Sequence, residues 1–92
     1  MTTQEFDDYL RARGRADEVN ESLRKLGFSP EFVAKNVLSA GGTVTVSHVA
    51  MLWQGMPNKH DRKRTRQLFD ELTAVGLLEP AGDDETWKLL SG

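Results

Sequence analysis

The chain has 92 residues, of which 38% are hydrophobic and 28% charged, with a formal net charge of −2 and no cysteine. This balance is typical of one small globular domain, and the absence of cysteine excludes disulfide scaffolds, thiolate metal sites and cysteine nucleophiles. The longest apolar run, residues 49–53, is far shorter than the roughly 20 residues of a membrane span, and the charged first 25 residues do not resemble a signal peptide, so we expect a cytoplasmic protein.

The first 27 residues have a helical pattern. Thr2 and Glu5 have the spacing of a capping box, which predicts a helix start at the beginning of the chain. Gly14 is a candidate interruption, and Gly27 has the position of a glycine that ends a helix. We expect a helical N-terminal extension over residues 1–27.

An apolar stripe runs along this extension. Its members are Phe6, Tyr9, Ala16, Val19 and Leu23, three of which recur at intervals of seven residues. Such a stripe is the pattern of a helix that packs against another helix. Two interpretations stay open: the stripe is a homodimer face, or it covers a helix of its own chain.

Three short elements follow. Ser29 has the position of an N-cap for a helix over residues 30–40, which two glycines end. The β-branched run at residues 43–46 predicts a short edge strand. Ser47 is expected to cap a second helix, residues 48–54, before a turn that contains glycine and proline.

A longer helix is expected from about Asn58 to Val75, ended by Gly76. Its apolar stripe predicts a buried face. The members of the stripe are Thr65, Leu68, Leu72 and Val75. Two short strands around a polar turn, residues 77–80 and 85–90, complete the chain.

The leucine-rich helix end and the two leucines after Gly76, with Thr86–Leu89 as a returning strand, resemble the winged helix-turn-helix family. The resemblance covers residues 43–90. It implies a mostly α fold with a small β-hairpin wing, here preceded by the N-terminal helical extension. The domain organisation that it implies is residues 1–27 as the extension and residues 28–92 as the winged helix domain.

The cations are concentrated in the longer helix, where residues 59–69 hold five cations and only one anion, Asp61. Four of the five lie opposite the apolar stripe, whereas Arg64 lies nearer the buried flank, where a structural role is the expectation. The resemblance implies that this helix enters the major groove of DNA. We therefore predict a small DNA-binding protein, a transcription regulator, with double-stranded DNA as its partner. The predicted DNA-binding residues are Ser47, His48, Asn58, Lys59, His60, Arg62, Lys63 and Arg66. For Ser47 the plain N-cap is the alternative role.

One feature departs from the family pattern: the wing carries three consecutive acids, Asp83, Asp84 and Glu85, which would repel phosphate. We expect them to face a partner protein or a second protomer. The alternative function is a winged-helix module for protein–protein interaction in a larger assembly. The sequence has no nucleophile–base pair, carboxylate dyad, phosphate-binding glycine loop or metal-ligand spacing, so we expect no catalytic residue, metal or cofactor.

Overall fold

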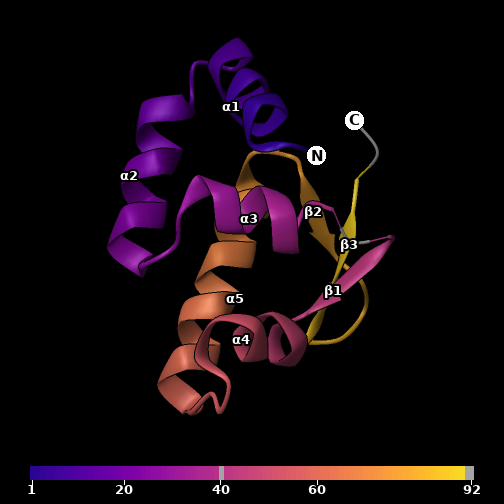
Figure 1. Ribbon diagram of the computed structural model, residues 1–92. Helices are drawn as coiled ribbons and strands as arrows, with labels where there is room; N and C mark the ends of the chain where they lie inside the picture. The colour runs from indigo at the N-terminus through magenta and orange to yellow at the C-terminus, as the bar shows by residue number, and fades with distance from the viewer. Residues whose placement is uncertain (40, 91–92) are drawn as a thin grey trace. The chain divides into compact units, whose positions relative to one another are not determined.

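The computed structural model describes residues 1–39 and 41–90. Over these residues it has five helices and one three-stranded antiparallel sheet, with two of the three strands after the last helix (Figure 1). The predicted fold class, mostly α with a small β-hairpin wing after an N-terminal helical segment, is confirmed. The chain divides into two compact units, Met1–Ser39 and Ala40–Gly92. The domain boundary between residues 27 and 28 stays a prediction.

The first unit holds α1 (Thr3–Ala12), α2 (Ala16–Leu26) and α3 (Pro30–Asn36). The predicted capping box opens α1: the hydroxyl of Thr2 accepts from the amide of Glu5 at 3.1 Å, and the Glu5 carboxylate accepts from the amide of Thr2 at 2.9 Å. Both partners are exposed, and the hydrogen bond from the Thr2 amide to the carboxylate holds the pKa of Glu5 below its ordinary value.

Gly14, with φ of 67°, interrupts the helical pattern between α1 and α2, as the sequence predicts. Ser29 caps α3, since its hydroxyl accepts from the amide of Phe32 at 3.1 Å. The α-helix ends at Asn36, earlier than predicted, and the turn that follows begins with Val37.

The apolar stripe of the extension is part of the core. Phe6, Val19 and Leu23 are at most 1% exposed, and the other two members, Tyr9 and Ala16, are half-buried. Within this unit α1 packs on both α2 and α3. The three buried side chains are therefore inaccessible to a second copy of the chain, and homodimerisation stays a prediction that they do not support.

The second unit holds β1 (Thr43–Thr45), α4 (Val46–Gln54), α5 (Lys59–Ala74), β2 (Leu78–Pro80) and β3 (Thr86–Leu89). The order in the sheet is β1-β3-β2, so β1 is an edge strand, as predicted, and pairs with the last strand of the chain (Figure 1). α4 and α5 pack on each other, and β2 and β3 form the hairpin.

The predicted cap of α4 is wrong. Thr45, in extended conformation, is the N-cap, and its hydroxyl accepts from the amide of His48 at 3.2 Å. The helix already begins at Val46, whose side chain is fully buried and whose amide donates to the carbonyl of Glu85 at 2.9 Å. Because the strand runs directly into the helix, Ser47 lies exposed in the first helical turn and caps nothing.

The buried face of α5 is confirmed, as Thr65, Leu68 and Leu72 have no exposed surface. Phe69 is also buried, and its ring meets the ring of Trp87 of β3 edge to face, with centroids 5.1 Å apart. After α5 the chain turns sharply through glycine into β2. No helix in residues 1–39 and 41–90 is long and apolar enough to cross a membrane.

Candidate nucleic-acid interface

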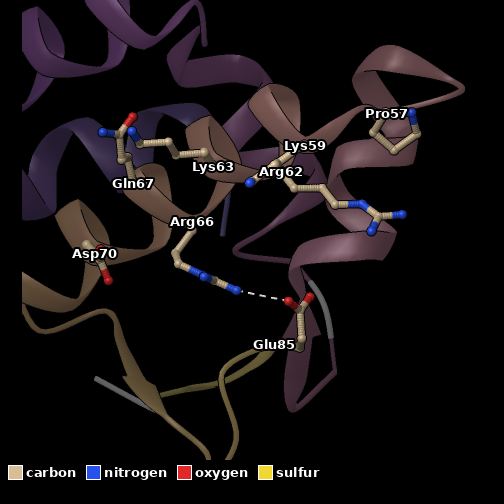
Figure 2. Close-up of a pocket in the computed structure, with 8 residues that line it drawn as sticks. All are labelled: Pro57, Lys59, Arg62, Lys63, Arg66, Gln67, Asp70 and Glu85. Atoms are coloured by element: carbon tan, nitrogen blue, oxygen red, sulfur yellow. Dashed lines mark hydrogen bonds and ion pairs between the residues drawn. The ribbon is translucent and has the colours of Figure 1, made fainter.

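Four cations project from the outer side of the first half of α5. Lys59, Arg62, Lys63 and Arg66 are all exposed, whereas Thr65 on the opposite side is fully buried. The four line one surface hollow of about 730 Å³ (Figure 2). The rest of the lining is Pro57, Gln67, Asp70 and Glu85. The hollow thus combines four positive charges with two carboxylates, and α5 supplies most of it.

Local hydrogen bonds fix the rotation of α5. The indole nitrogen of Trp53 in α4 donates to the hydroxyl of Thr65 at 3.1 Å, and this hydroxyl donates to the carbonyl of Asp61 at 2.9 Å. With the inner face of α5 tied to α4 in this way, the cations can only point outward. Arg64 stands apart from them: it is half-buried, with its guanidinium 4.9 Å from the centre of the Trp53 ring.

Asn58, which was predicted to contact DNA, is the N-cap of α5. The side chain of Asn58 accepts from the amide of Asp61 at 2.9 Å, and the Asp61 carboxylate accepts from the amide of Asn58 at 3.1 Å. This capping box leaves Asp61 only 8% exposed. No role was predicted for Asp61, because the usual capping-box residue three positions after the N-cap is Glu or Gln, whereas here the shorter Asp61 fills that position.

The structure brings together only half of the predicted DNA-binding residues. Ser47 and His48 are exposed at the start of α4, and His60 is exposed at the start of α5. None of these three, nor Asn58, is among the residues that line the hollow. Gln67, which does line it, was missed, although it lies one helical turn after Lys63.

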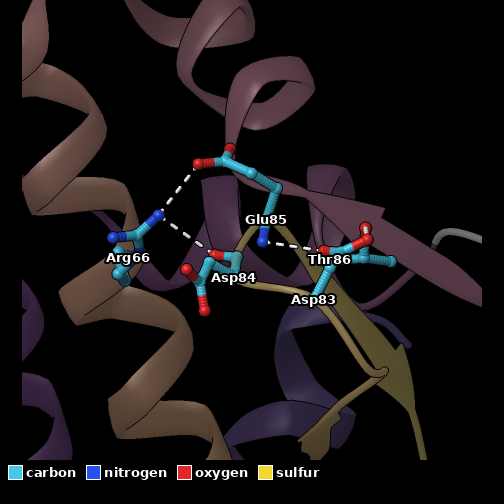
Figure 3. Close-up of polar contacts among 5 residues, drawn as sticks. All are labelled: Arg66, Asp83, Asp84, Glu85 and Thr86. Atoms are coloured by element: carbon cyan, nitrogen blue, oxygen red, sulfur yellow. Dashed lines mark hydrogen bonds and ion pairs between the residues drawn. The ribbon is translucent and has the colours of Figure 1, made fainter.

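The acidic wing meets the basic helix. The Nη2 atom of Arg66 donates to the Oε1 atom of Glu85 at 2.9 Å and to the backbone carbonyl of Asp84 at 3.0 Å (Figure 3). Arg66 and Glu85 are 19 residues apart in the chain, so no local pattern could have revealed this pair. That the acids face another protein stays a prediction, and the carboxylate of Glu85 is already engaged within the chain.

The carboxylate of Asp83 makes hydrogen bonds within the same turn instead of with α5. Its carboxylate accepts from the backbone amide of Glu85 at 2.8 Å and from the hydroxyl of Thr86 at 3.3 Å. These hydrogen bonds, chiefly the one from the Glu85 amide, hold the pKa of Asp83 below its ordinary value. Asp83 therefore shapes the turn, whereas Glu85 acts on α5.

Comparisons with protein-family models, with curated proteins and with solved structures find no match for this chain. In the part of the chain that the structure describes, no group of three or more His, Asp or Glu side chains is placed to hold a metal ion.

Proposed function

We propose that the protein binds double-stranded DNA with the outer face of α5 and acts as a transcription regulator. One observation carries the proposal: four exposed cations surround a single hollow on a helix whose opposite face is buried. The helix is the second of the α4–turn–α5 pair and is followed by a hairpin, which is the order of a winged helix-turn-helix. The lack of cysteine and the absence of a membrane-spanning helix in the described residues suit a cytoplasmic location.

The cations suit two kinds of contact. Arg62 and Arg66 can offer paired donors to the O6 and N7 atoms of guanine in the major groove. Lys59 and Lys63 suit phosphates, where a single mobile charge suffices. The N-terminus of α4, where Ser47 is exposed, is a further position at which backbone amides can donate hydrogen bonds to a phosphate oxygen.

The test is a titration of a short random-sequence duplex, followed by fluorescence anisotropy at several salt concentrations. If three or more cations neutralise phosphates, the logarithm of the affinity should fall against the logarithm of the salt concentration with a slope of about −2.7 or steeper. An affinity no better than millimolar at low salt would overturn the proposal.

A second function is favoured by a different surface. Three large apolar side chains of α4 and the turn after it are exposed: Met51 by 58%, Leu52 by 47% and Met56 by 93%. Large apolar side chains left exposed this close together in the chain suit a protein–protein contact. The alternative is therefore a winged-helix interaction module in a larger assembly, and a failed DNA titration would favour it.

A further inference from the structure

The contact between Arg66 and the wing involves the donor atom that paired recognition of guanine would need. A guanidinium has two edges that can each donate two parallel hydrogen bonds, one formed by Nε and Nη2 and the other by Nη1 and Nη2. Nη2, which belongs to both edges, donates to the Glu85 carboxylate and to the Asp84 carbonyl (Figure 3). A paired contact with guanine on either edge uses Nη2, so guanine must compete with the two acceptors in the wing.

The ion pair of Arg66 with Glu85 is exposed enough for Arg66 to exchange Glu85 for another partner. The Arg66 side chain is 44% exposed and the Glu85 side chain 51%, and ion pairs of this kind shift an equilibrium by about fivefold at most. A paired arginine–guanine contact discriminates by roughly five- to 150-fold, so a guanine can displace the wing. A contact of one guanidinium nitrogen with one phosphate oxygen is, like the wing pair, a single solvent-exposed ion pair, and it has no comparable advantage.

From this balance we infer that Glu85 is a specificity-determining residue: it competes with DNA for Arg66 and releases it to guanine but not to the phosphate backbone. The inference rests on the proposed function, because it concerns the same face of α5. Arg66 then contributes little to the affinity for most sequences and contributes to it where a guanine lies opposite. This increases the ratio of the affinity for specific DNA to that for non-specific DNA.

The neighbouring acid supplies a matched control. Asp84 is in the same turn, but only its backbone carbonyl meets Arg66, and its carboxylate makes no hydrogen bond or ion pair in the described part of the chain. Glu85→Ala and Asp84→Ala therefore each remove one negative charge from the wing tip, and only Glu85→Ala removes a side-chain contact with Arg66. Asp83 is left unchanged, because it holds the turn together.

The experiment measures the affinity of both variants for a random-sequence duplex over a range of salt. We expect Glu85→Ala to bind about two- to fivefold tighter than Asp84→Ala, and its salt slope to steepen by about 0.9, the contribution of one further phosphate. Both differences should vanish when Arg66 is also alanine. Selection from a randomised duplex pool should show a weaker guanine preference for Glu85→Ala than for the unchanged protein.

The two proposals fail in different ways. Equal affinities and equal slopes for Glu85→Ala and Asp84→Ala, with DNA binding retained, would overturn this inference and leave the proposed function standing. Absence of DNA binding by the unchanged protein and by both variants would overturn the proposed function and this inference with it. If thermal melting shows that Glu85→Ala is unfolded, Glu85→Ser replaces it, with Asp84→Ser as its control, because the serine side chain is too short to keep the contact that Glu85 makes with Arg66.

Discussion

At the scale of single residues, the two arginines of the outer face of α5 differ in what holds them. Arg66 is bound to the wing through Nη2, whereas Arg62 makes no hydrogen bond or ion pair with another described residue. Both line the same hollow (Figure 2). A free guanidinium can meet DNA without first giving up a partner, so Arg62 should contribute to binding on every sequence.

We therefore predict that Arg62→Ala weakens DNA binding, by about 1–3 kcal/mol on sequences where Arg62 contacts a guanine, without lowering the melting temperature. Sequence preference should relax at the contacted base pair. The measurement is the affinity for a selected and for a random duplex.

Arg11→Ala is the matched control, since Arg11 is an exposed arginine of α1 that pairs with Asp7. It should change the affinity only slightly. Binding of the Arg62 variant as tight as that of this control would show that Arg62 does not face DNA.

At the scale of the elements, the first turn of α4 shows how a cap is chosen. Ser47 and Thr45 are both residues that favour helix N-caps. The burial of Val46 and its hydrogen bond to the carbonyl of Glu85 make Val46 the first helical residue, which leaves Thr45 as the residue in extended conformation.

Thr45→Ala should accordingly lower the free energy of unfolding by about 1 kcal/mol, because the amide of His48 loses its acceptor. Ser47→Ala should leave it within about 0.5 kcal/mol, as expected of an exposed position. The free energies of unfolding of both variants are measured by denaturant unfolding. A larger loss for the Ser47 variant would contradict the assignment of the cap.

The two faces of α5 allow a similar comparison. Leu72 is fully buried, and Leu72→Ala should lower the free energy of unfolding by about 2–5 kcal/mol through the cavity that it leaves. Gln67→Ala, on the exposed side of the same helix, should change it by less than about 0.5 kcal/mol. If the two variants melt at nearly the same temperature, the rotation of α5 and the outward direction of its cations are both wrong.

At the scale of the whole molecule, the burial of Leu23 favours a monomer over a dimer. Leu23 is fully buried in the single chain, together with Phe6 and Val19 from the predicted dimer face. A core residue of this kind stabilises the fold of its own chain and has no surface left for a partner.

We predict that sedimentation gives the mass of one chain, 10.3 kDa, for the unchanged protein. Leu23→Ala should reduce the free energy of unfolding by about 2–5 kcal/mol without changing that mass. A mass of two chains that falls to one in this variant would restore the homodimer face.

Much of the candidate site could be predicted from the sequence, because helical periodicity is local. The spacing of Leu68 and Leu72 places the buried stripe of α5, and with it the opposite position of Arg62 and Arg66. The start of α4 could not be predicted in the same way. Thr45 and Ser47 are equivalent as local signals, and only the packing of Val46 decides between them.

By itself, then, the sequence determined the mostly α fold with its C-terminal hairpin, the buried face of α5 and the concentration of cations on the other face. Only the tertiary structure decided what the acidic wing does. The pairing of β1 with β3 sets Thr45 opposite Thr86, and the turn held by Asp83 then delivers Glu85 to Arg66. The physical reason is that strand pairing joins residues distant in the chain, and no helical or alternating period records which side chains meet there.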